Sequence, residues 1–265
     1  MKTLLIQHKQ DITTITLNRP ECRNALNQEM IAELTQAFGN LSPEMRTVIL
    51  CGAGDIFCAG ADLNWMRQSK DFTHAENLAD AKHLADMFAA IVNAKCATIA
   101  KVHGAAFGGG AGLAACCDIV VADENCKFGF PEVRIGLIPA VISPYVLRRI
   151  SVAQVQRYFI TGETITATRA LQIGLVDEIY STAVCDDVIN KLIKNLLAAG
   201  PNALIAAKRL LHDVSKLINN TDANKYYEYT SEAIASLRVQ AEAQEGLKAF
   251  LEKRQPSWIK NKKQE

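Results

Sequence analysis

Short apolar runs and amphipathic stretches alternate along much of the chain. The runs have the length and composition of β-strands, and the stretches between them repeat apolar residues at helical spacing. The expected strands are residues 3–9, 12–18, 47–51, 97–102, 119–122 and 175–180. The expected helices are residues 28–41, 74–94, 152–161 and 167–173, with a short one that ends at Cys116. The first two strands flank Lys9-Gln10-Asp11 and predict a β-hairpin, and strands separated by helices predict an α/β fold.

The pattern changes after Ser181, where the rest of the chain is almost wholly helical. The helices expected there are residues 183–199, 202–218 and 223–253. A boundary near Gly200-Pro201 divides the chain into a core of residues 1–200 and a C-terminal helical region of residues 201–265. The last helix carries more apolar residues than a solitary helix can bury: Tyr226, Tyr229, Ile234, Leu237, Ala241, Leu247 and Phe250. It either folds back on its own domain or packs against another subunit, and the two arrangements are compatible.

Three consecutive glycines follow the strand expected at 97–102 and precede the short helix. Gly108, Gly109 and Gly110 suit a tight turn or a close approach to a ligand. A helix start also presents unpaired N–H groups that can stabilise a developing negative charge. The segment therefore predicts either an oxyanion site or a tight turn packed against a neighbour. It is no dinucleotide loop, because Leu113 stands where G-x-G-x-x-G needs glycine, and the chain has neither a phosphate-binding G-x-x-x-x-G-K-[ST] nor a G-x-S-x-G.

Glu132 is the candidate acid/base group, because it follows Pro131 inside the apolar segment 128–133. A carboxylate that is desolvated in such surroundings has a raised pKa, as a general acid/base near neutral pH requires. The alternative is a surface glutamate in the first turn of a short helix, where proline and glutamate are both favoured.

A second turn of small residues, Phe57-Cys58-Ala59-Gly60-Ala61-Asp62-Leu63, leads from the strand at 47–51 into a helical pattern. Two such turns could direct two backbone N–H groups at one carbonyl oxygen. With these segments the chain resembles the crotonase (enoyl-CoA hydratase/isomerase) superfamily, over essentially its whole length. The matching segments are Leu17-Asn18-Arg19-Pro20, Arg23-Asn24-Ala25-Leu26, FCAGADL at 57–63, GGG at 108–110, FGFPEVRIGLIP at 128–139 and AFLEKR at 249–254.

The resemblance implies a crotonase-like spiral of ββα turns with a C-terminal helical trimerisation region, in a homotrimer or a dimer of trimers. It implies an acyl-CoA thioester substrate, an oxyanion hole made by the N–H groups of Ala61 and Gly109, and Glu132 as the catalytic residue. The implied substrate- and CoA-binding positions are Arg23, Ala25, Ala59, Asp62, Leu63, Trp65, Gly108, Gly112, Pro131, Phe250 and Lys253. Phe250 and Lys253 match residues that reach a neighbouring subunit's CoA. No metal or redox cofactor is implied, since coenzyme A is part of the substrate.

The sequence departs from the family pattern at Gly112, where many hydratases have the first of two glutamates. Glu132 is then the single carboxylate, and a branched substrate could use the space beside the glycine. Residues 140–145 and 62–66 are similar to a subgroup that hydrates branched glutaconyl-CoA thioesters, including the methylglutaconyl-CoA hydratases of leucine breakdown. Three candidates could bind the free carboxylate of such a substrate: Arg67, Arg134 and Arg148.

Three functions are compatible with this sequence. The first is a hydratase of a branched 2-enoyl-CoA, the second a single-glutamate enoyl-CoA isomerase, and the third a non-catalytic acyl-CoA-binding or scaffold member. Trp65 and Met66 would line the acyl pocket, although such a pair is equally typical of a plain core.

Composition excludes other classes of partner. A net charge of +1 over 265 residues argues against nucleic-acid or anionic-membrane binding. No apolar run reaches the ~18 residues of a membrane span, and residues 1–17 do not resemble a signal peptide. The eight cysteines form no C-x-x-C pair and the five histidines lack metal-ligand spacing. A cytoplasmic protein with reduced thiols and no metal is therefore expected.

Overall fold

The computed structural model describes residues 1–181, 184–218 and 223–259. The chain forms two compact units, Met1–Ile189 and Asn190–Glu265, which are described separately. The boundary expected near Gly200-Pro201 coincides with the start of α9 (Pro201–Ile218), whereas the two units divide after Ile189, inside α8 (Cys185–Ala198). No helix in the described part of the chain combines the length and apolar character that crossing a membrane would require.

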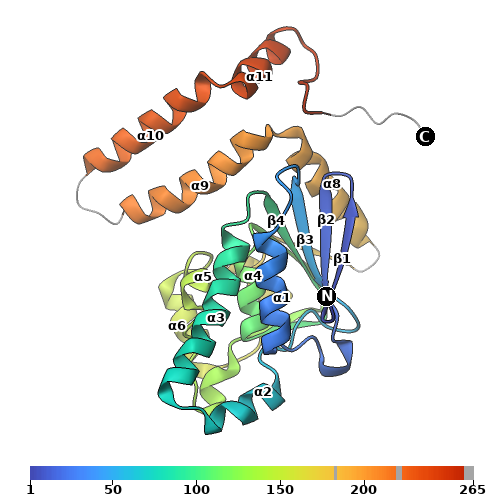
Figure 1. Ribbon diagram of the computed structural model, residues 1–265, viewed down its shortest axis with the longest axis vertical. Coiled ribbons are helices and arrows are strands. Elements are labelled where there is room, and N and C mark those ends of the chain that lie inside the picture. Colours follow the sequence, from blue (N-terminus) through green and yellow to red (C-terminus); the bar gives the residue numbers. More distant parts are fainter. Residues whose placement is uncertain (182–183, 219–222, 260–265) are drawn as a thin grey trace. The chain divides into compact units, whose positions relative to one another are not determined.

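The first unit contains a six-stranded sheet, of which Figure 1 labels β1 to β4. Its order is β1 (Leu4–Lys9), β2 (Ile12–Leu17), β3 (Thr47–Gly52), β4 (Ala97–Val102), β6 (Ile119–Asp123) and β9 (Glu178–Tyr180). Strands β1 and β2 form the expected antiparallel hairpin, and all later neighbours pair in parallel. Parallel strands need crossover connections, usually helices, and this requirement explains the alternation in the sequence.

A second, three-stranded sheet was not expected from the sequence. It consists of β5 (Ala105–Phe107), β7 (Lys127–Gly129) and β8 (Ile165–Thr166). These strands are too short to show a period along the chain. The sheet matters for the site because β5 lies between the end of β4 and the glycine turn.

Side chains cap several helices of the first unit. Asn27 caps α1 (Gln28–Gly39) by accepting the N–H of Met30 at 2.9 Å. Thr73 and Glu76 form a capping box at the start of α3 (His74–Val92). The remaining helices of the unit are α2 (Leu63–Gln68), α4 (Gly109–Cys116), α5 (Ser143–Leu147), α6 (Val152–Thr161) and α7 (Ala167–Gln172), with 3₁₀ turns η1 (Pro20–Cys22), η2 (Ser69–Asp71) and η3 (Pro131–Ile135).

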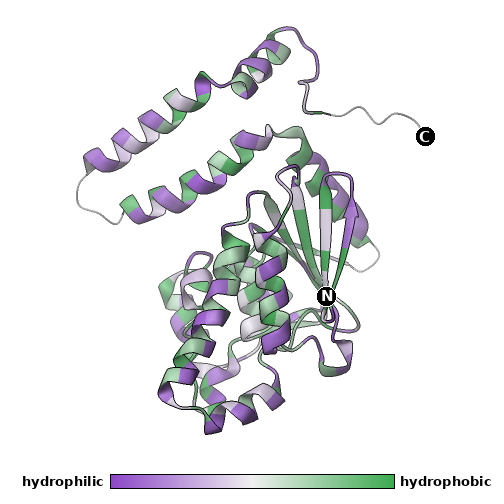
Figure 2. Ribbon diagram, viewed as in Figure 1, coloured by the Kyte–Doolittle hydropathy of each residue, from purple (hydrophilic) through white to green (hydrophobic). Residues whose placement is uncertain are grey.

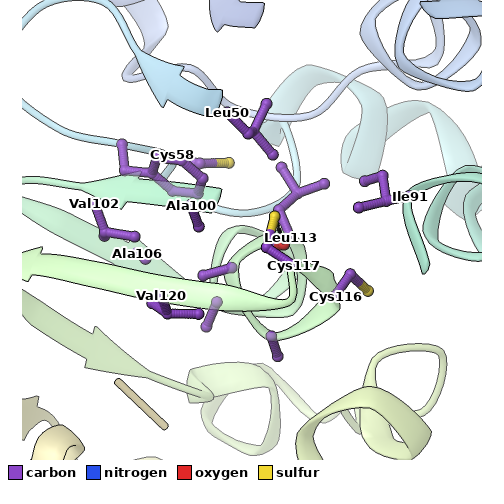
Figure 3. Close-up of a cluster of buried hydrophobic side chains, with 14 of the residues drawn as sticks. Leu50, Cys58, Ile91, Ala100, Val102, Ala106, Leu113, Cys116, Cys117 and Val120 are labelled. Atoms are coloured by element: carbon purple, nitrogen blue, oxygen red, sulfur yellow. Dashed lines mark hydrogen bonds between the residues drawn. The ribbon is translucent and has the colours of Figure 1, made fainter. Parts of the chain in front are cut away.

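Helix α4 lies in the core, against β4, β5, α3 and α5. Its residues from Gly110 to Cys116 are all buried, so the helix has no polar face. Figure 3 shows Leu113 of this helix together with buried side chains of other elements, including Leu50, Ile91, Ala100 and Val120. The start of this helix is consequently fixed by packing on several sides.

The second unit contains α9, α10 (Ala223–Arg238) and α11 (Ala241–Leu251). The prediction of a single helix over 223–253 is wrong. The chain leaves the helical conformation between α10 and α11, where Gln240 is extended (φ −75°, ψ 148°). The Glu242 carboxylate accepts the N–H groups of Asn202 and Ala203 at 3.0 and 2.8 Å and thereby caps α9. Apolar and polar residues alternate along α9 and α10 (Figure 2), and α10 and α11 leave Ile234, Leu247 and Phe250 exposed.

Candidate active site

Backbone hydrogen bonds hold the two small-residue turns side by side. The N–H of Cys58 donates to the Ala105 carbonyl at 3.1 Å, and the N–H of Phe107 donates to the Cys58 carbonyl at 3.0 Å. On the other side of the same turn, Leu26 donates to Gly60 at 2.7 Å, and Asp62 donates to Leu26 at 2.9 Å. Residues 58–62 are therefore fixed between the strand that precedes the glycine turn and the segment at 25–26.

The candidate oxyanion donors lie on these joined segments. Neither the N–H of Ala61 nor that of Gly109 donates a hydrogen bond within the described residues. The turns approach closely, because a Cβ on Gly60 would lie only 3.7 Å from the Gly109 nitrogen. Gly109 is the first residue of α4, so its N–H is one of the donors that a helix start leaves free. The structure thus leaves both main-chain donors available on neighbouring backbones, while their catalytic role stays a prediction.

Glu132 reaches the start of α4 from the turn η3. A Cβ on Gly108 would lie 2.8 Å from Oε1 of Glu132, so a side chain there would have to displace this carboxylate. Gly108 also has φ +50°, a conformation that other residues rarely adopt, and its N–H donates to the Gly129 carbonyl at 2.9 Å. The acid/base candidate is thereby placed one residue from the Gly109 donor.

The other carboxylate oxygen of Glu132, Oε2, is buried and has no hydrogen-bond partner among the described residues. Burial raises the pKa of Glu132 above its ordinary value, while the backbone N–H of the same residue acts in the opposite direction. A buried polar atom without a partner costs free energy in a resting protein and is often associated with function. Such a carboxyl group can exchange a proton with a ligand near neutral pH.

Asp62 is bound by donors of the protein itself. Its carboxylate caps α2 by accepting the N–H groups of Asn64 and Trp65 at 2.8 and 3.3 Å, and it accepts Nη2 of Arg19 at 2.9 Å. Burial alone would raise the pKa of Asp62, but these hydrogen bonds outweigh it and lower the pKa. The substrate contact expected of Asp62 stays a prediction, and its observed partners are structural.

The sequence alone gave no role to Arg19, although this residue belongs to the matching segment Leu17-Asn18-Arg19-Pro20. Besides Asp62, it donates from Nη1 to the Ala25 carbonyl at 2.6 Å. The N–H of Ala59 donates to the Arg23 carbonyl at 3.0 Å, and Arg23 itself is exposed. Three expected CoA-binding positions, Arg23, Ala25 and Ala59, therefore lie together beside the Ala61 turn.

From the sequence, the space beside Gly112 was expected to be open to a branched substrate. This expectation is wrong, because the space is filled. A Cβ on Gly112 would lie 2.3 Å from Cγ2 and 2.9 Å from Cβ of Ile142, and 3.3 Å from Cε1 of Phe88. Ile142 is only 3% exposed. A side chain of the protein already fills the position at which many family members have a carboxylate.

The remaining expected residues differ in their surroundings. Leu63 is exposed, Pro131 is partly buried, and Trp65 packs against the core with a buried Nε1 that has no partner among the described residues. Phe250 and Lys253 belong to the second unit, where Phe250 is exposed.

The three candidate arginines are all exposed. Arg134 is already engaged, because its Nε donates to the Thr161 carbonyl at 3.4 Å.

Comparison with known proteins establishes the family. The model of the family Enoyl-CoA hydratase/isomerase matches residues 7–261. The chain therefore belongs to this family and is an enzyme of the enoyl-CoA hydratase class, and the expected crotonase fold is confirmed.

Individual relatives align over nearly their whole length. The 2,3-dehydroadipyl-CoA hydratase of Escherichia coli is 31% identical, covering 97% of this chain and 99% of that protein. The crotonyl-CoA hydratase of Syntrophomonas wolfei is 29% identical, covering 97% and 98%. The crystal structure of an enoyl-CoA hydratase from Shewanella pealeana superposes with a TM-score of 0.91 at 37% identity, covering 97% of this chain and 96% of the other.

Proposed function

We propose that this enzyme reversibly hydrates a branched 2-enoyl-CoA thioester, with 3-methylglutaconyl-CoA as the substrate to test first. The observation that carries the proposal is the unpartnered, buried Oε2 of Glu132 next to two unused main-chain donors. A branched glutaconyl chain follows from the resemblance of residues 62–66 and 140–145 to that subgroup. A dicarboxylic acyl chain also agrees with the name of the Escherichia coli relative.

In the proposed mechanism Glu132 serves as both base and acid. It takes a proton from water while the water oxygen bonds to C3 of the thioester. The C2–C3 π electrons move toward the carbonyl oxygen, where the N–H groups of Ala61 and Gly109 stabilise the enolate. Glu132 then returns the proton to C2, which gives the 3-hydroxyacyl thioester. One oxyanion donor contributes about 3–4 kcal/mol to lowering such a barrier.

The raised pKa of Glu132 supports this double role. A group that must accept and then donate the same proton works best when its pKa is near the working pH. Burial moves Glu132 in that direction, and its free oxygen can approach a substrate without breaking a hydrogen bond within the described residues.

An enoyl-CoA isomerase is the second candidate, and the contact between Gly112 and Ile142 favours it. This contact leaves the site one carboxylate, and one carboxylate is enough to move a proton between C2 and C4.

Product masses distinguish these reactions. The purified protein is incubated with 3-methylglutaconyl-CoA, crotonyl-CoA and a 3-enoyl-CoA, and the products are analysed by mass spectrometry and chromatography. Gain of one water supports the hydratase, and a shifted double bond at unchanged mass supports the isomerase. Tight CoA binding without turnover would contradict both and would indicate a non-catalytic member.

Self-association as a homotrimer or dimer of trimers is part of the proposal. It is supported by exposed apolar side chains on the second unit: Leu211, Ile234, Val239, Leu247, Phe250 and Leu251. Sedimentation of the full chain and of a chain that ends before Lys248 tests it. A monomeric full-length protein would contradict it. A truncated protein with the same number of subunits and the same CoA affinity as the full-length protein would also contradict it.

A further inference from the structure

Two glycines on successive turns at the start of α4 each receive a side chain from another element. The N–H of Gly112 donates to the Gly108 carbonyl at 3.0 Å, so Gly112 lies one turn further along. At Gly108 the missing Cβ leaves room for Oε1 of Glu132, and at Gly112 it leaves room for Cγ2 of Ile142. The carboxylate of Glu132 and the branched side chain of Ile142 thus pack on successive turns at the start of α4.

Ile142 cannot easily turn away from Gly112. Its carbonyl accepts the N–H groups of Tyr145 and Val146, both at 3.1 Å, so its backbone forms the start of α5. The Phe88 ring borders the same space and lies 5.6 Å from the Tyr145 ring. Ile142 is 3% exposed and lies at the start of α5, against Gly112 of α4 and close to the space that Phe88 of α3 borders.

A side chain at position 112 would extend toward Glu132. Side chains on a helix lean toward its N-terminus, and the preceding turn contains Gly108, against which Glu132 lies. A polar side chain at this position could hold a water molecule or share a proton with Glu132. Ile142 occupies this space with hydrocarbon, which can do neither.

We propose that Ile142 is a specificity-determining residue, which by packing on Gly112 limits the site to one carboxylate and sets the ratio of hydration to double-bond isomerisation. This inference rests on the proposed function, because it assigns to Ile142 the balance between the two candidate reactions. With one carboxylate, the same group must hold the attacking water and move the proton. A second carboxylate that held the water would favour hydration over proton transfer alone.

The test combines substitutions at the two positions. Gly112→Glu alone should lower the melting temperature and abolish turnover, because the new Cβ meets Cγ2 and Cβ of Ile142 at 2.3 and 2.9 Å. Gly112→Glu/Ile142→Ala removes the closer contact. It should regain most of the melting temperature and raise the ratio of hydration to isomerisation at least about tenfold over wild type, within the range of acid–base catalysis.

The matched control is Gly112→Glu/Ile142→Val. Valine keeps both colliding atoms, so this variant should remain as damaged as Gly112→Glu, whereas Ile142→Val alone should keep the wild-type ratio. Ile142→Ala alone measures the effect of the cavity. Circular dichroism confirms folding, and the kcat and KM of each reaction are measured with crotonyl-CoA and a 3-enoyl-CoA.

Two results would overturn the inference: an unperturbed, fully active Gly112→Glu protein, or a double variant with alanine whose reaction ratio equals that of wild type. A wild-type protein without turnover would contradict the proposed function instead. In that case hydration activity in Gly112→Glu/Ile142→Ala, but in none of the other variants, still supports the role of Ile142. If this double variant shows no hydration activity either, the role of Ile142 is overturned.

Discussion

Arg19 and Asp62 form an ion pair, with 2.9 Å between Nη2 and Oδ2, directly beside the candidate donor Ala61. The Asp62 side chain is 8% exposed and that of Arg19 is 18% exposed, so solvent screens the pair only weakly. The same aspartate caps α2, and the same arginine binds the Ala25 carbonyl. The pair therefore connects three segments around the Ala61 turn.

Asp62→Ala should destabilise the protein by roughly 3–5 kcal/mol, because it leaves Arg19 without its partner in a mostly buried site. Asp62→Asn keeps an acceptor for the cap and should cost less. Urea unfolding measures both. Since the pKa of Asp62 is lowered in the folded protein, its contribution should be complete above the ordinary value of 3.8 and lost as the pH falls through the lowered pKa. Equal stability of Asp62→Ala and wild type at neutral pH would contradict this role.

Glu132→Gln should reduce turnover by at least about 10²-fold and leave CoA binding largely unchanged. Glutamine keeps the shape of the side chain but cannot accept the proton. Steady-state kinetics and CoA titration measure the two effects. Near-normal hydration by this variant would exclude Glu132 as the catalytic group.

The same substitution predicts a dependence of stability on pH. The pKa of Glu132 is raised, so its contribution to stability is complete below its ordinary value of 4.5 and is lost as the pH rises through the raised pKa. Glu132→Gln stays neutral at every pH. It should match wild type near pH 4 and be more stable near pH 8, as measured by urea unfolding. If the variant is less stable than wild type near pH 8, burial is not the dominant influence on the pKa of Glu132.

Gly108→Ala should lower activity by displacing Glu132, since the new Cβ would lie 2.8 Å from Oε1. Gly136→Ala is the control, because Gly136 also has a positive φ, +77°, but no atom of the described residues within 4 Å of its added Cβ. Both substitutions introduce backbone strain of about 1–2 kcal/mol. Only Gly108→Ala should also reduce kcat, and equal kcat values for the two variants would contradict the proposed contact.

Gly109→Pro should reduce kcat by about 10²–10³-fold, because proline removes one main-chain donor. Gly109→Ala retains the N–H and is the matched control. Its Cβ would meet only Cδ1 of Leu26 at 2.9 Å, the end of a flexible side chain. Circular dichroism checks that both variants fold. A folded and fully active Gly109→Pro enzyme would exclude this donor.

The sequence was sufficient for the large sheet and the main helices of the first unit, because the apolar runs and helical spacing are long enough to be distinctive. The three-residue strands β5 and β7 carry no such period and were missed. The break in the last helix was missed as well, because Gln240 is no obvious helix breaker.

The site was predictable only where neighbours in sequence create it. The glycine turn and the Pro131-Glu132 pair are local features, so their residues could be named. The contact between Gly112 and Ile142 joins separate elements, and Arg19 meets Asp62 across 43 positions. A single sequence does not show which residues far apart along the chain come into contact. The space beside Gly112 was consequently interpreted as open.

The pairing of Cys58 with Ala105 and Phe107 has a consequence for how this enzyme could vary over evolution. The proposed donors are main-chain groups, and main-chain hydrogen bonds keep their two turns together. Replacing a side chain that is not at a turn glycine would leave the donors in place, so a scan with alanine would detect Glu132 but not the donors themselves. Insertions, deletions, prolines and substitutions of the turn glycines would be the damaging changes, because a Cβ on Gly60, for example, would lie 2.8 Å from the Phe107 carbonyl oxygen. The surrounding side chains could diverge toward new acyl groups.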